Sequence, residues 1–159
     1  MIPTSVWDYS SGKFSDELNN GFQPEIKQLN TDIGLKNKLE EFKNNKNILR
    51  GIKDSFTATP PRADLSVHMG AMTSGSAVIA SKDYVDQMIK PQSRKIIGIE
   101  MEIYGVFYAC QHTGNGSVKF FAMKSVVDYA DDEKSDNFHD YACFVSANAV
   151  EKFALNYLL

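Results

Sequence analysis

The sequence is poor in cysteine, in long apolar runs and in unbalanced charge. Cys110 and Cys143 lack the spacing of a metal site, and we expect reduced core thiols in a cytoplasmic protein. No apolar run reaches the roughly 20 residues of a membrane-spanning helix, and no signal peptide is recognisable at the N-terminus. The net charge of −3 provides no broad field for nucleic acid or an anionic membrane, so neither is expected as a partner.

Two further absences narrow the chemistry. The histidines, His68, His112 and His139, are scattered without ligand spacing, so no metal site is expected, and His139 is assigned to the surface. The sequence contains no glycine-rich phosphate loop and no nucleophile–histidine–acid set in a recognisable order. Its composition, 43% hydrophobic and 23% charged over 159 residues, is typical of one globular domain with a full core.

Stretches whose apolar residues recur at the spacing of a strand alternate along the chain with stretches whose apolar residues recur at the spacing of a helix. We expect strands at Ile2–Tyr9, Asp64–Thr73, Lys95–Ile99 and Val118–Val127. We expect helices starting at Thr31 or Asp32, at Ser81, at Met101 and at Asp136 or Asn137. Residues 14–30 are assigned to a surface loop. Strands that alternate with helices predict an α/β domain whose helices pack on a largely buried sheet.

The stretch IIGIEMEIYGVFYAC, at residues 96–110, places two acids where a strand is expected to pass into a helix. Glu100 and Glu102 lie on either side of Met101 and are flanked by apolar residues. Carboxylates in such surroundings are costly to bury unless a hydroxylated ligand or cationic side chains offset the cost. The alternative is that both glutamates only cap the next helix.

A second stretch, FFAMKSVVDYADDEKSD, also passes from an expected strand into an acidic loop. Asp128 follows the strand directly, at the kind of strand end where ligands collect in α/β sheets. The acids beyond it are assigned to a solvated loop: Asp131, Asp132, Glu133 and Asp136.

Three ordered segments resemble the nucleoside phosphorylase and nucleosidase superfamily, which includes bacterial purine nucleoside phosphorylase and methylthioadenosine/S-adenosylhomocysteine nucleosidase. They are HMGAMTSGSAVIAS, IGIEMEIYGVFYA and MKSVVDYADDEKSD. Three motifs in the right order are more specific than one acidic pair. The resemblance covers residues 64–159 well and residues 1–63 only through WDYSSGK. It implies a single domain over residues 1–159 with a three-layer α/β/α sandwich fold.

The resemblance also implies roles for the acids. Glu102 matches the family glutamate that holds the ribose hydroxyls, which suits a carboxylate because charge-assisted hydrogen bonds are strong. Met101 is expected to pack against the sugar, and Glu100 to be either a second acceptor or a structural acid. Asp128 matches the aspartate that bonds the purine at N7 and donates a proton there. That role requires a pKa raised by a dry pocket.

Three residues match positions that line the base pocket of the family: Ser74, Val78 and Ile79. Val78 stands where the family carries Phe, which reduces the surface for stacking on a purine. Trp7 or Tyr9 either replaces that surface or belongs to the core. Val127, a further pocket residue, stands where nucleosidases carry Ser, and Lys124 stands where they often carry Arg.

The expected reaction is cleavage of a purine nucleoside or nucleotide at its N-glycosidic bond, by water or by phosphate. No cofactor is expected, and phosphate is a co-substrate only if the reaction is a phosphorolysis. Roughly the first hundred residues of the family domain, which carry the nucleophile site, have no counterpart here, so the resemblance predicts an N-terminally truncated domain. The alternative is an inactive nucleoside-binding or structural remnant. An incomplete sheet is expected to self-associate or to dock on a partner chain that supplies the missing half.

Overall fold

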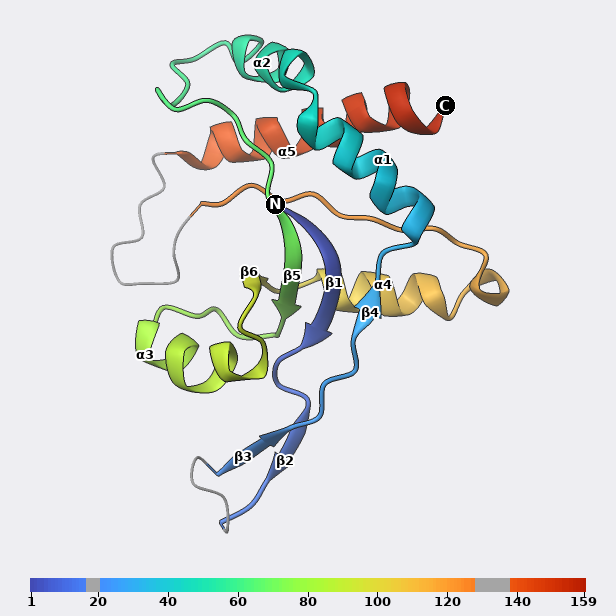
Figure 1. Cartoon of the computed structure of the whole chain (residues 1–159). Helices are drawn as coiled ribbons and strands as arrows, with labels where there is room; N and C mark the ends of the chain where they lie inside the picture. Colours follow the sequence, from blue (N-terminus) through green and yellow to red (C-terminus); the bar gives the residue numbers. More distant parts are fainter. Residues whose placement is uncertain (17–20, 128–137) are drawn as a thin grey trace.

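A four-stranded sheet forms the centre of the computed structural model, which describes residues 1–16, 21–127 and 138–159 (Figure 1). The strand order is β4-β1-β5-β6. The strands are β1 (Ile2–Asp8), β4 (Leu29–Asn30), β5 (Met69–Ser74) and β6 (Ile96–Glu100). β1, β5 and β6 run parallel, and β4 is antiparallel to β1. The expected strands near residues 2, 64 and 95 are therefore present, the second beginning only at Met69.

Two helices follow the first strands, and side chains cap both. α1 (Ile33–Asn44) begins after Asp32, whose carboxylate accepts a hydrogen bond from the Leu35 N–H at 3.0 Å. Asp32 is thus the cap, and Thr31 is not. α2 (Lys46–Asp54) begins after Asn45, which accepts from the Ile48 N–H at 3.2 Å. The sequence analysis did not predict α2.

The first apolar cluster joins α1 and α2 to α5 (His139–Phe153). Phe153 is fully buried, with ring centroids 5.7 Å from Phe42 and 5.0 Å from Phe121. Val145 and Ala149 are buried along the same side of the helix. Residues 136 and 137, the expected caps of this helix, lie outside the described residues.

The second apolar cluster packs α4 (Ile103–Gln111) against β1 and β5. Ile103 and Phe107 are buried against Val6 and Met72. Tyr104 packs on the same cluster, whereas Val106, with an exposed fraction of 51%, lies outside the buried face of the helix.

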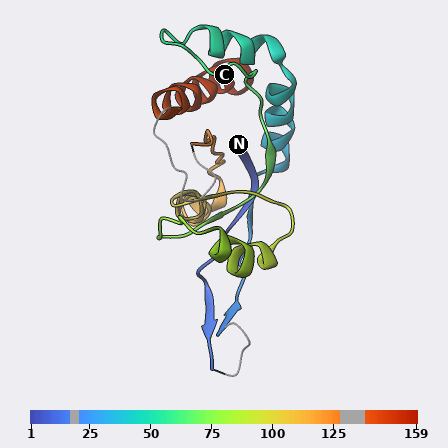
Figure 2. The same cartoon turned by 90° about the vertical axis from the view of Figure 1, so that its left-hand side faces the viewer.

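A shorter helix and a hairpin complete the described elements. α3 (Lys82–Tyr84) begins after Ser81, as predicted, and Ser81 accepts from the Tyr84 N–H at 3.3 Å. Further helical turns span Val85–Ile89, Lys90–Gln92, Gly114–Gly116 and Ala154–Leu158. β2 (Gly12–Phe14) and β3 (Phe22–Pro24) form a hairpin within a region assigned to a loop. The hairpin extends away from the rest of the chain in both views (Figure 1, Figure 2).

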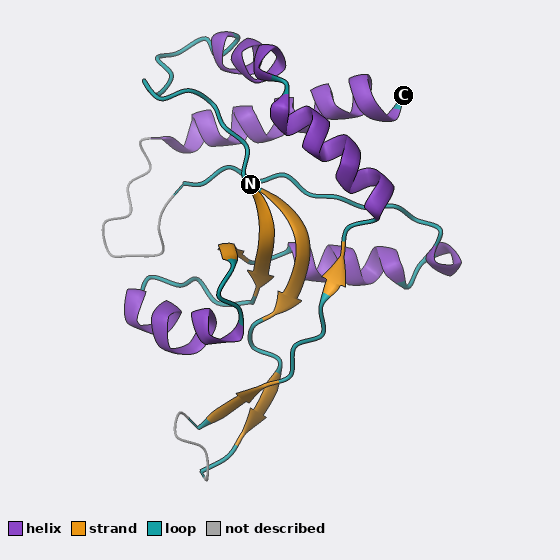
Figure 3. Ribbon diagram, in the orientation of Figure 1, coloured by secondary structure: helices purple, strands orange, loops and turns teal. Residues whose placement is uncertain are grey.

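The predicted strand over residues 118–127 does not form. The stretch is drawn as loop in Figure 3, and within the described residues its only backbone–backbone hydrogen bonds join Lys124 to Met1. A strand is defined by pairing with a neighbour, and here no strand lies alongside for more than one residue.

The cysteines also differ from expectation. Both are free, but Cys110 is half-buried and Cys143 is exposed, so Cys143 is not a core thiol. None of the described helices combines the length and the apolar character needed to cross a bilayer.

The fully buried Phe153 ring predicts a large loss of stability on truncation. We expect Phe153→Ala to lower the free energy of unfolding by about 3–5 kcal/mol, because it removes aromatic contacts and leaves a cavity. Phe14→Ala is the matched control: Phe14 is 76% exposed, and its loss should cost less than about 1 kcal/mol. Urea unfolding monitored by circular dichroism measures both. Equal costs would show that the first cluster is not packed as described.

Candidate active site

Glu100 is the buried acid of the strand–helix junction. Its side chain is 5% exposed at the end of β6. One carboxylate oxygen accepts from the Glu102 N–H at 2.7 Å and the Ile103 N–H at 2.9 Å, which satisfies the first turn of α4. The other oxygen accepts from the Ser74 hydroxyl. Glu100 therefore makes the contacts that a capping side chain makes at the start of α4.

Ser74 supports this acid from the neighbouring strand. It is buried at the end of β5, and its hydroxyl also accepts from the Tyr104 N–H at 2.8 Å. Both hydrogen-bonding directions of the hydroxyl are therefore used within the protein. Ser74 lies behind Glu100 and is absent from the lining of the cavity described below.

Lys124 joins the two acids from a distant part of the chain. Its Nζ lies 3.2 Å from a Glu100 oxygen and also donates to a Glu102 oxygen. The Glu102 side chain is 61% exposed, and no helix-capping hydrogen bond holds it. The two acids thus differ: Glu100 has several buried partners, whereas Glu102 presents its carboxylate to solvent.

The lysine fixes the charge of Glu102. A hydrogen bond from Lys124, together with its positive charge, lowers the pKa of Glu102, although partial desolvation opposes the shift. Burial would lower the pKa of Lys124, but its hydrogen bonds and charge interactions with both glutamates outweigh this and raise the pKa. Glu102 is therefore an anion and Lys124 a cation near neutral pH.

A cavity of about 870 Å³ opens beside these residues. It brings together most of the site residues predicted from the sequence: Val78, Ile79, Glu100, Met101, Glu102 and Val127. They come from three separate stretches of the chain, so the structure unites what the sequence showed only as ordered motifs. Val78 and Met101 are exposed, at 68% and 43%, and present apolar surface to it. Asp128 follows Val127 directly but lies outside the described residues.

Five residues of α5 also line this cavity, and none of them was predicted as a site residue: His139, Ala142, Cys143, Ser146 and Ala147. His139 and Cys143 lie one helical turn apart, with 3.8 Å between Nδ1 and Sγ. Their spacing of four residues was the available signal, because it places both side chains on one face of a helix. Trp7 and Tyr9 are buried in the core and do not line the cavity, so neither replaces the missing aromatic wall.

Comparison with known proteins identifies the relatives of the chain. A family model described as the phosphorylase superfamily matches residues 1–158. The uncharacterized protein y4jS of Sinorhizobium fredii is 27% identical over 144 residues, which cover 90% of this chain and 35% of that protein.

Solved structures show the same fold. The 5'-methylthioadenosine/S-adenosylhomocysteine nucleosidase of Streptococcus pneumoniae matches with a TM-score of 0.66 and 18% identity, covering 96% of this chain and 59% of that chain. Futalosine hydrolase of Helicobacter pylori matches with a TM-score of 0.65 and 18% identity, covering 96% and 58%. The α/β fold class predicted from the sequence is confirmed. The chain spans less than two thirds of each of these relatives.

The ion pair predicts a specific titration shift. In Lys124→Met the hydrogen bond and the charge that lower the pKa of Glu102 are lost, so this pKa should rise toward the ordinary range of a glutamate. Carboxyl ¹³C NMR titration measures it. Lys119→Met is the control, because Lys119 pairs instead with Asp32, at 3.2 Å. An unchanged Glu102 titration in Lys124→Met would contradict the described contact.

The lowered pKa of Glu102 should also make the free energy of unfolding depend on pH. Because the folded pKa of Glu102 is lowered, its contribution is complete above about pH 4.3, the ordinary glutamate value, and is lost as the pH falls through the lower folded value. Glu102→Gln should therefore destabilise the protein at neutral pH, and the difference from the parent chain should disappear in acid. Urea unfolding across this pH range measures the difference. A difference that persists at the acid end would contradict the linkage.

Proposed function

Because the chain belongs to the phosphorylase superfamily, we propose that it binds a purine nucleoside or nucleotide in the 870 Å³ cavity and acts in cleaving its N-glycosidic bond. The observation that carries this proposal is the ionised, outward-facing carboxylate of Glu102 at the wall of that cavity. The two solved neighbours named above, a nucleosidase and a hydrolase, support the class of reaction.

The sugar end of the ligand is assigned to Glu102 and Met101. A carboxylate can accept hydrogen bonds from two neighbouring hydroxyl groups, as a ribose offers them, and such bonds are strong because the acceptor is charged. The exposed Met101 side chain provides an apolar surface next to that carboxylate. Lys124 keeps Glu102 ionised without enclosing it.

The base end of the ligand is assigned to the apolar wall formed by Val78, Ile79 and Val127. These aliphatic side chains offer contact area but no ring for stacking. His139 is the one aromatic ring among the described lining residues, and it faces the same cavity from α5. The base is therefore held mainly by shape and by van der Waals contact.

The reaction requires a proton for the leaving base. As the bond between the sugar C1′ and the base nitrogen breaks, its electron pair moves into the purine, and a proton on N7 neutralises it. We assign this proton to Asp128 as general acid, in keeping with the family resemblance. The oxygen of water or of a phosphate anion then forms the new bond to C1′, and an attacking water loses one proton, which passes to solvent. Phosphate therefore belongs to the proposal only as a co-substrate.

A second candidate function is nucleoside binding without turnover, or a purely structural role. The chain spans 59% of the nucleosidase and 58% of the hydrolase, so the activity of a whole nucleosidase does not follow from the shared fold. Orientation and base protonation each contribute to such a reaction, but a full rate also requires an activated nucleophile.

Free base released from a nucleoside tests the proposal. The protein is incubated with adenosine, inosine, methylthioadenosine or ATP, with and without phosphate, and the base is quantified by chromatography. We expect release from at least one compound and a loss of about 100-fold or more in Asp128→Asn, because the proton donor is removed. Asp54→Asn, at the exposed end of α2, is the matched control and should retain the parent rate.

Binding separates the two candidate functions. Glu102→Gln should weaken nucleoside binding by about tenfold through the loss of a charged acceptor, whereas Glu151→Gln at the surface of α5 should not. Saturable binding without base release supports the binding function. If no nucleoside binds at all, the proposed function is wrong.

A further inference from the structure

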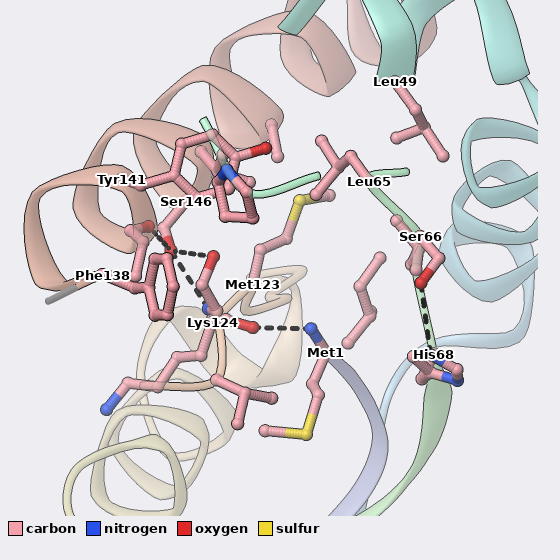
Figure 4. Close-up of a pocket in the computed structure, with 18 of the residues that line it drawn as sticks. Met1, Leu49, Leu65, Ser66, His68, Met123, Lys124, Phe138, Tyr141 and Ser146 are labelled. Atoms are coloured by element: carbon pink, nitrogen blue, oxygen red, sulfur yellow. Dashed lines mark hydrogen bonds between the residues drawn. The ribbon is translucent and has the colours of Figure 1, made fainter. Parts of the chain in front are cut away.

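A second cavity, of about 460 Å³, lies next to the start of β1 (Figure 4). Two extended stretches flank Met1 and Ile2 there. On one side, the Ile2 N–H donates to the His68 carbonyl at 2.9 Å, and His68 belongs to the stretch that leads into β5. On the other side, the Lys124 N–H donates to the Met1 carbonyl at 2.9 Å. The first residues of β1 therefore bridge two backbones that do not otherwise pair.

The stretch on the Lys124 side has the geometry of a strand without its hydrogen bonds. Phe121 and Met123 pack on the first apolar cluster, whereas Phe120 and Ala122 pack on the second. This alternation covers both faces of the stretch, as in a strand between two helix layers. Within the described part of the chain, no backbone hydrogen bond is made from Phe120 to Met123.

The opposite wall is similar. Leu65, Ser66 and Val67 belong to no helix or strand, and in the described residues their backbone groups also lack backbone partners. Unpaired backbone groups in half-buried surroundings are costly, so both walls favour an occupant that carries N–H and C=O groups. Met1 and Ile2 themselves lie between the two backbones that they bond, and the cavity of about 460 Å³ is the further space that both walls line.

Apolar side chains enclose the remaining sides of this cavity. Leu49 of α2 and Leu65 lie on one side in Figure 4, and Met123 and Tyr141 lie on the other. Val145 and Ala149 of α5 complete the lining. An occupant must therefore combine an extended polar backbone with apolar side chains.

We propose that this cavity is a docking slot for an extended polypeptide segment with alternating apolar side chains, which adds as a strand between the two walls. A small apolar ligand would leave the backbone of both walls unpaired. The solved neighbours of the same fold contain polypeptide beyond the part that matches this chain, which agrees with a polypeptide occupant.

The slot and the nucleoside cavity share the stretch from Met123 to Val127. A strand paired with this backbone fixes the position from which Lys124 reaches Glu102. The docking proposal itself does not rest on the proposed reaction, because it follows from backbone pairing alone.

A labelled peptide of about eight residues, alternating valine and threonine with lysines at its ends, tests the slot. Fluorescence anisotropy, recorded without nucleoside, should show saturable binding to the full chain. The same peptide with N-methylated threonines should bind about tenfold more weakly, because methylation removes two or three backbone donors and keeps the side chains. No binding, or equal binding of both peptides, would overturn the proposal.

Two substitutions on one helix locate the site. Ala149→Leu narrows the slot and should weaken peptide binding about tenfold, whereas Ala147→Leu, which faces the nucleoside cavity, should leave it unchanged. If Ala149→Leu does not fold, the comparison of the plain and the N-methylated peptide on the parent chain still tests the proposal. A dimer that Ala149→Leu dissociates and that blocks binding of the peptide would make a second copy the occupant instead. Binding of an apolar dye in the slot that the peptide cannot displace would also contradict the proposal that a peptide strand occupies it.

Discussion

The carboxylate of Glu100 is the interaction on which the described site depends. A buried charge is tolerated only when it is fully paired, and this one accepts from the Ser74 hydroxyl, from two N–H groups that start α4, and from Lys124. It thereby connects the end of β5, the end of β6, the beginning of α4 and the stretch that contains Lys124. Removing the carboxylate would leave unpaired donors on three separate segments.

The same interaction gives the two acids of the junction, Glu100 and Glu102, different surroundings. The Glu100 carboxylate accepts the hydrogen bonds of the N–H groups at the start of α4. The Glu102 carboxylate therefore makes no capping hydrogen bond, and Glu102 lines the cavity. Lys124 bonds both acids, so it neutralises the buried charge and also holds the exposed one in its ionised form. The exposed carboxylate of Glu102 therefore keeps its charge beside a structural ion pair at little extra cost in desolvation.

Local patterns in the sequence predicted the features that depend on local geometry. The strand at residues 2–8, the cap at Asp32 and the strand–helix junction at Glu100 follow from spacing and side-chain chemistry. Features that depend on distant partners did not follow. The alternation over residues 118–127 is real, but a strand also needs a neighbour. α2 was not among the expected helices, although the Asn45 side chain caps its start. The contact of Lys124 with both acids joins residues more than twenty positions apart, so only the fold reveals it.

The most direct test of the account is whether Glu102 recognises a ribose diol. Isothermal titration calorimetry would compare adenosine with 2′,3′-dideoxyadenosine, which lacks both hydroxyls, on the parent protein and on Glu102→Gln. The account predicts that the parent protein binds adenosine at least about tenfold more tightly than the dideoxy compound, and that the substitution removes this preference. Equal affinity of the parent protein for both compounds would contradict it.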